Sequence, residues 1–80
     1  MNITTKLNRA EDDQVDNDYD VSVDGKLTPY SIQHCPYMNR NQEYCVNYWD
    51  DANGVMYEVG YAAALAGAVK IIEKDIKGKI

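Results

Sequence analysis

The sequence predicts an α+β domain in which an antiparallel sheet of three to four strands, built from two hairpins, is packed by one C-terminal helix. Two observations carry this prediction. Apolar and polar residues alternate at residues 19–24 and 55–59, which is the period of a strand. From Tyr61 onward the apolar residues recur at helical spacing instead. A chain of 80 residues is enough for one domain, which we expect to cover residues 19–80.

The N-terminal residues 1–18 carry no sustained period. Ile3 and Leu7 are the only large apolar side chains before Val15. We therefore expect an acidic N-terminal arm that is partly flexible, with one short helical turn around residues 9–13.

The first expected hairpin covers residues 19–34. Asp24-Gly25 suits its tight turn, because glycine adopts a positive φ without a Cβ penalty. Pro29 cannot donate a ladder hydrogen bond, so the return strand should lie at an edge of the sheet or be broken at this residue.

The second expected hairpin joins residues 43–49 to residues 55–59 through a turn that ends in Asn53-Gly54. Alternation divides its side chains between two faces. One face should carry Tyr44, Val46, Tyr48, Val55, Tyr57 and Val59, and the other Cys45, Asn47, Trp49, Met56 and Glu58.

The C-terminal helix is expected over residues 61–76, after Gly60 ends the last strand. Its apolar stripe consists of Tyr61, Leu65, Ala68, Val69, Ile72 and Ile76. The alanines of this segment favour a helix, and Gly67 and Ala68 should allow it to approach the sheet closely. Lys77-Gly78 is a plausible end of the helix.

Charge is distributed unevenly along the chain. The formal net charge is −5. Residues 11–58 hold eleven acidic and two basic residues, a local net charge of −9, whereas residues 61–80 have a local net charge of +2. Phosphates would be repelled by the acidic part, which argues against direct binding of nucleic acid or an anionic membrane. A folded surface with rows of carboxylates instead suits a basic protein partner.

The sequence gives no sign of export or of a membrane span. The first seven residues lack the apolar core of a secretory signal, and no run approaches the roughly 18 apolar residues of a spanning helix. We therefore expect a cytoplasmic protein in which Cys35 and Cys45 are free thiols.

A calcium site is not expected, although Asp16, Asp18 and Asp20 have the spacing that begins a calcium loop. Such a loop needs glycine at its sixth position and a bidentate glutamate at its twelfth. Val21 and Leu27 occupy those positions here. The acidic residues are better explained as a solvated or partner-facing surface.

Metal, cofactor and catalytic sites are likewise not expected. His34, Cys35 and Cys45 lack the paired spacing and the fourth ligand of a zinc site. No phosphate loop, nucleophile elbow or zinc-protease motif is present. We therefore expect a protein that is not an enzyme and that binds no cofactor.

Aromatic side chains are numerous, with seven tyrosines and one tryptophan. Tyr30, Tyr37 and Trp49 are hard to place in the expected core, and exposed aromatic residues beside carboxylates are favoured at protein interfaces. The expected partner-binding residues are Asp16, Asp18, Asp20, Asp24, Tyr30, Tyr37, Trp49, Asp50, Asp51 and Glu58.

In its size, acidity, order of elements and lack of a catalytic motif, the chain resembles the small inhibitory proteins that bacteriophages make against host machinery. These include anti-CRISPR proteins and DNA-mimic antirestriction proteins. The resemblance implies an inhibitor that occupies the basic nucleic-acid-binding surface of a host protein, such as a CRISPR effector, in the host cytoplasm. The basic C-terminal helix would confine any mimicry of DNA to the sheet and the N-terminal arm.

A second interpretation stays open at this level. The chain could be a small structural or regulatory subunit of a bacterial complex, with its acidity serving only solubility. The sequence also leaves open whether the protein is a monomer or a homodimer.

Overall fold

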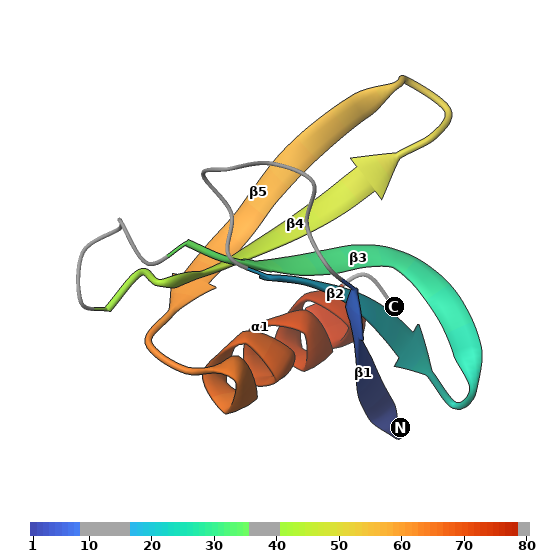
Figure 1. Cartoon of the computed structure of the whole chain (residues 1–80). Helices are drawn as coiled ribbons and strands as arrows, with labels where there is room; N and C mark the ends of the chain where they lie inside the picture. Colours follow the sequence, from blue (N-terminus) through green and yellow to red (C-terminus); the bar gives the residue numbers. More distant parts are fainter. Residues whose placement is uncertain (9–16, 36–40, 79–80) are drawn as a thin grey trace.

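The computed structural model of the chain describes residues 1–8, 17–35 and 41–78. In these residues five strands precede one helix (Figure 1). The elements are β1 (Ile3–Asn8), β2 (Asn17–Val23), β3 (Lys26–His34), β4 (Tyr44–Asp50), β5 (Val55–Ala62) and α1 (Leu65–Gly78). The strands form one antiparallel sheet in the order β1-β2-β3-β4-β5. The α+β class is confirmed, but the expected count of three to four strands is wrong, because there are five.

The additional strand is β1, which lies in the segment that we expected to be an arm. It pairs with β2 from Ile3 opposite Val23 to Asn8 opposite Asp18. Ile3 packs against the core, so one side of this short strand gains apolar contact. The alternation of apolar and polar residues in β1 is weak, because threonine, lysine and asparagine occupy every position except Ile3 and Leu7. The helical turn expected at residues 9–13 lies outside the described residues.

The first hairpin turn is confirmed. Asp24 and Gly25 both have positive φ, at 52° and 83°, as a two-residue turn between twisted strands requires. Asp24 also fixes the start of the chain, because its amide donates to the carbonyl of Asn2 at 2.8 Å and its carboxylate accepts from the amide of Asn2 at 2.8 Å.

The expectation that Pro29 marks an edge strand is wrong, since β3 is the central strand of the sheet. The alternative, a break at Pro29, is not seen either, since β3 is continuous from Lys26 to His34 and only its pairing is irregular. The register between β2 and β3 shifts between Asp20 and Ser22, and the pairing of β3 with β4 begins only at Tyr30. Thr28 donates its hydroxyl to the carbonyl of Val21 at 2.7 Å. A proline is tolerated here because the ladder needs no backbone donor at this residue.

The helix begins four residues later than expected. Tyr61 and Ala62 still belong to β5, where they pair with Cys45 and Tyr44 of β4. Pairing in the sheet outweighs the helix propensity of alanine at this boundary. The expected end of the helix at Gly78 is confirmed.

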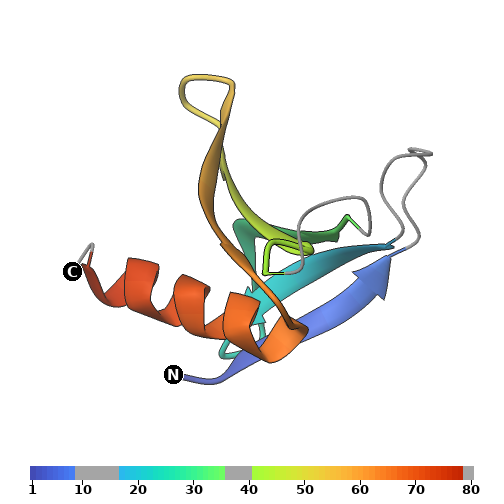
Figure 2. The same ribbon diagram turned by 90° about the vertical axis from the view of Figure 1, so that its left-hand side faces the viewer.

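The core lies between α1 and one face of the sheet (Figures 1 and 2). Its buried residues are Val21, Tyr30, Ile32, Val46, Ala62, Ala68 and Ile72. Small residues let the helix approach β5. A Cβ atom added to Gly67 would lie 3.1 Å from Cβ of Ala62, and one added to Gly60 would lie 3.3 Å from Cγ2 of Ile71.

The β4–β5 hairpin extends past the helix and projects from the rest of the molecule, as both views show (Figures 1 and 2). An α-helix of 14 residues is only about 21 Å long. It covers the base of the hairpin and leaves its tip uncovered. Val55 (41%) and Tyr57 (50%) are therefore exposed on the face that α1 covers elsewhere, while Trp49 (40%) and Met56 (50%) are exposed on the opposite face, which α1 does not cover.

We predict that Ile72→Asp prevents folding. The side chain of Ile72 is fully buried, and an unpaired carboxylate in this core would be left without solvation. Domains of this size have a stability of only about 4–12 kcal/mol. Even Ile72→Ala should cost about 2–5 kcal/mol. Thermal unfolding followed by circular dichroism checks this, with Ala66→Asp on the exposed side of α1 as the matched control. A cooperative transition of wild-type midpoint for Ile72→Asp would contradict the packing described here.

Candidate protein-binding surface

The face of the sheet opposite α1 is polar and, among the residues that the structure describes, carries three carboxylates. We call it the acidic face and define it by Asp18, Asp20, Glu58 and the single cation Lys6. These residues alternate along their strands with side chains that face α1, such as Val21. The register sets them in two neighbouring cross-strand rows. One row is Lys6, Asp20, Ser31, Asn47 and Glu58, and the other is Asn8, Asp18, Gln33, Cys45 and Tyr61.

The carboxylates of the acidic face are spread over much of the sheet. Asp18 and Asp20 lie two residues apart on β2, a separation of about 7 Å. Glu58 is three strands away from Asp20, about 14 Å across the ladder. Asn8 donates its side-chain amide to Asp20. The face therefore presents negative charge over an area and not at a single point.

Asp18 is held in an unfavourable position for a charge. One of its carboxylate oxygens, Oδ1, is buried and accepts no hydrogen bond within the described part of the chain. Burial raises the pKa of Asp18, and the nearby charge of Asp20 raises it further.

Glu58 is paired with a phenol on its own strand. Tyr61 donates its hydroxyl to Oε2 of Glu58 at 2.7 Å. This hydrogen bond to a carboxylate is the main reason why the pKa of Tyr61 is raised to about 12. The contact orients Glu58, which remains exposed on the edge strand.

Between the carboxylates lies a neutral polar network. Asn47 is buried and donates its amide to Oε1 of Gln33 at 3.0 Å. Sγ of Cys45 lies 3.5 Å from Oδ1 of Asn47. Burial is the largest cause of a raised pKa for the Cys45 thiol. A thiol with a raised pKa is less often present as the reactive thiolate.

The structure brings together only some of the residues that the sequence suggested for partner binding. Asp18, Asp20, Trp49 and Glu58 share the acidic face. The other acidic residues that were expected to bind a partner and that the structure describes lie at the hairpin turns instead, namely Asp24, Asp50 and Asp51. Asp16 and Tyr37 lie outside the described residues.

Two of the turn acids also have local structural roles. Asp24 binds the backbone of Asn2, as described above. The carboxylate of Asp50 accepts hydrogen bonds from the backbone amide of Asn53 at 3.3 Å and from its side chain at 2.7 Å. Gly54 completes that turn with a φ of 65°. These contacts hold the turns in shape, whereas Asp51 remains exposed.

Tyr30 is not available for partner binding, which corrects the sequence-based expectation. It is only 5% exposed, its ring meets that of Tyr48 edge-on at 5.0 Å, and its hydroxyl donates to Asp75 of α1. The register irregularity beside Pro29 keeps Tyr30 on the face that α1 covers. Its hydroxyl is accommodated in the core because the helix supplies an acceptor.

Sequence reasoning missed the exposed apolar side chains of the hairpin tip. Alternation placed Val55 and Tyr57 on the face expected to be covered by the helix. They do share that face with Tyr48, which is opposite Tyr57. They are nevertheless exposed, because α1 does not extend to the tip. The sequence did contain a signal for this exposure, because the expected helix is too short to cover the whole length of the expected hairpin.

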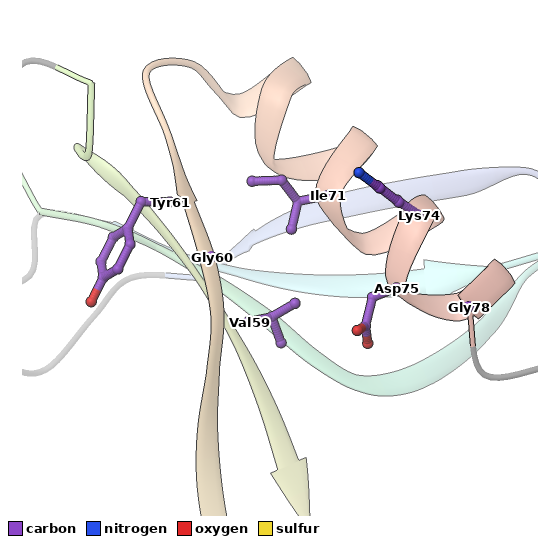
Figure 3. Close-up of a pocket in the computed structure, with 7 residues that line it drawn as sticks. All are labelled: Val59, Gly60, Tyr61, Ile71, Lys74, Asp75 and Gly78. Atoms are coloured by element: carbon purple, nitrogen blue, oxygen red, sulfur yellow. The ribbon is translucent and has the colours of Figure 1, made fainter.

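A groove of about 530 Å³ lies between β5 and α1 (Figure 3). It is lined by Val59, Gly60, Tyr61, Ile71, Lys74, Asp75 and Gly78. Val59, Ile71 and Asp75 are directed toward the space between strand and helix, while the ring of Tyr61 turns away from it. No cluster of three or more histidine, cysteine or acidic side chains that could hold a metal ion occurs in the described ranges.

We predict that Glu58→Gln lowers the pKa of Tyr61 from about 12 toward 10. Removing the carboxylate removes the charged acceptor that retains the phenol proton. At present the raised pKa stabilises the folded state below pH 10, and this contribution is lost as the pH rises from 10 to about 12. An NMR titration of the Tyr61 ring measures the shift. Glu73→Gln on α1 is the matched control, and an unchanged Tyr61 pKa in Glu58→Gln would refute the assigned cause.

We also predict that Asp18→Asn stabilises the fold at neutral pH. A raised pKa means that the folded state favours the protonated carboxyl, so the ionised group lowers stability above that pKa. The melting temperature of the variant should exceed that of the wild type, and the difference should shrink as the pH falls through the raised pKa. Asp51→Asn in the exposed turn is the control. An equal or lower melting temperature for Asp18→Asn would contradict the prediction.

Comparison of the chain with models of protein families, with curated proteins and with solved structures finds no match to any of them. No helix in the described part of the chain is long and apolar enough to cross a membrane. The site must therefore be interpreted from its own chemistry.

Proposed function

We propose that this chain is a non-catalytic binding protein that inhibits a nucleic-acid-handling protein by occupying its basic nucleic-acid-binding surface in the cytoplasm. The observation that supports this most directly is the acidic face. Three carboxylates are displayed on a folded sheet with a single lysine among them. This arrangement gives a negative surface of defined shape, which is what a basic groove on another protein would recognise.

The charge of Asp18 favours a binding role for this face. A protein that used its acidity only for solubility would gain most from carboxylates that are fully solvated. Asp18 instead has a buried oxygen without a donor and a raised pKa. An arginine or lysine of a partner placed beside this carboxylate would offset the raised pKa, because a nearby opposite charge favours the ionised form.

Trp49 extends the same face toward the hairpin tip, where it pairs with Met56. It is 40% exposed, and its indole nitrogen lies 3.4 Å from Oδ1 of Asp51. Buried aromatic anchors often dominate the energy of protein interfaces. In the proposed complex, the carboxylates select a basic partner and Trp49 supplies apolar contact area.

The second candidate function is that of a small subunit in a larger complex. The exposed apolar side chains of the hairpin tip favour it, since a contiguous uncovered apolar surface commonly marks an assembly site. This role differs from inhibition in what the partner can still do. A subunit leaves the nucleic-acid site of its partner open, whereas an occluding inhibitor closes it.

The experiment starts from a protein captured on the immobilised chain, with binding then measured by surface plasmon resonance. We predict that Glu58→Gln weakens binding roughly two- to fivefold, because an exposed ion pair contributes up to about 1 kcal/mol. Association should also slow as salt rises, since screening shortens the range of the attraction. Glu73→Gln removes the same charge from α1 and should leave binding unchanged. Equal effects of both substitutions would place the interface away from the acidic face.

Occlusion is tested separately by competition. The captured partner is given a labelled oligonucleotide that it binds, and the wild-type chain is added at increasing concentration. Loss of the oligonucleotide in proportion to the bound chain is the expected result. A ternary complex with undiminished nucleic-acid binding would rule out occlusion and support the subunit role.

A further inference from the structure

The strand β5 has an unpaired edge. It is the last strand in the order of the sheet, and the only strand of the described chain that it pairs with is β4. An open edge presents backbone donors and acceptors that can pair with another strand. The opposite edge, β1, carries Lys6 as an exposed charge that disfavours such pairing. In contrast, β5 contains only one charged side chain, that of Glu58.

The exposed apolar side chains gather on this same strand. Val55, Met56 and Tyr57 are consecutive residues of β5 and are 41–50% exposed. They lie on the part of the hairpin that projects beyond α1 (Figure 2), so a second strand could approach without meeting the helix. The edge thus combines free backbone groups with apolar contact area on both faces of the sheet.

The two ends of β5 carry opposite charges. The hairpin turn at one end contains Asp50 and the exposed Asp51. The groove between β5 and α1 at the other end is lined by Lys74 and by Asp75, whose carboxylate accepts a hydrogen bond from the hydroxyl of Tyr30 (Figure 3). Lys70 lies one turn earlier on the helix, so lysines outnumber carboxylates there. Neither lysine forms an ion pair with a residue that the structure describes, whereas Lys77 is paired with Glu73 at 2.8 Å. One edge therefore bears an acidic end and a basic end.

We propose that β5 pairs in antiparallel fashion with β5 of a second copy of this chain to form a two-fold symmetric dimer. A two-fold interface requires a self-complementary surface. An axis near Met56 and Tyr57 brings the acidic turn of each copy beside residues 59–61 of the other, at the groove lined by Lys74. The apolar side chains of the two β5 strands meet at the centre. The charge at each end of the strand is thereby matched by the opposite charge of the second copy.

The proposed dimer has a definite architecture. Antiparallel pairing of one edge with itself places the two-fold axis perpendicular to the sheet. Both copies of α1 then cover the same side of one continuous sheet, and both acidic faces lie on the other side. The proposal does not depend on the inhibitory function proposed above, but it would double the acidic area offered to a partner.

The first test is the molar mass of the full chain in solution, measured by size-exclusion chromatography with light scattering over a wide range of concentration. The wild type is expected to approach twice the chain mass at high concentration. Val55→Lys combined with Tyr57→Lys should reduce the mass to that of one chain, because charges on an edge strand oppose strand addition. Leu27→Lys, at an exposed apolar residue of the β2–β3 hairpin, is the matched control and should leave the dimer intact.

The second test uses charge reversal at the two ends of β5. Asp51→Lys and Lys74→Asp should each raise the Kd of the dimer about tenfold, because two exposed ion pairs per dimer become repulsive. The two changes combined in one chain should restore the affinity, since each acid again faces a base. All five residues changed in the two tests are exposed, and circular dichroism would confirm that each variant is folded.

Three outcomes would overturn the proposal. If the wild type has the molar mass of a single chain at every concentration, β5 does not pair with β5 of a second copy. A dimer that survives Val55→Lys and Tyr57→Lys has its interface elsewhere. If Asp51→Lys and Lys74→Asp each weaken the dimer but their combination does not restore its affinity, the turn of one copy does not pair with the groove of the other. Because Glu58 belongs to β5 as well as to the acidic face, the molar mass of Glu58→Gln is measured too. Asp20→Asn on β2 removes a carboxylate of the acidic face far from this edge and separates partner binding from dimer formation.

Discussion

The close packing of α1 on β5 determines most of what this domain exposes. The helix is the one described element that covers the apolar face of the sheet, and small residues at Gly60, Ala62, Gly67 and Ala68 set its distance from the strands. Because it is about 21 Å long, it buries the centre of the sheet and ends there. The burial of Tyr30, the exposure of the hairpin tip and the groove beside Lys74 all result from where the helix lies.

The opposite face illustrates how a small domain can retain a costly charge. Carboxylates that contribute to folding normally have lowered pKa values, because the folded state stabilises their ionised form. Asp18 has a raised pKa instead, and its buried oxygen lacks a donor. Local departures of this kind are typical of sites where stability is given up for binding. The neighbouring contact between Tyr61 and Glu58 has the opposite sign and stabilises the fold.

The two proposed interfaces use different features of the sheet and share Glu58. The acidic face would recognise a partner through charge displayed across the strands, whereas the edge of β5 would offer backbone groups and apolar side chains along one strand. Antiparallel pairing of the edges leaves the acidic faces uncovered. In the proposed arrangement a basic partner and a second copy would bind at the same time, and the acidic area would be continuous across the dimer.

The sequence by itself determined the α+β class, both hairpin turns and the end of the helix, because turn glycines and side-chain periods are local signals. It could not show that β1 joins the sheet, since that strand has few apolar residues and depends on β2 for its pairing. Nor could it show that β5 continues through Ala62, where ladder hydrogen bonds prevail over helix propensity. The separation of Tyr30 from Trp49 was also decided only by tertiary structure. Both are aromatic residues on strands, but the register turns Tyr30 toward α1 and Trp49 toward the opposite face, which the helix does not cover.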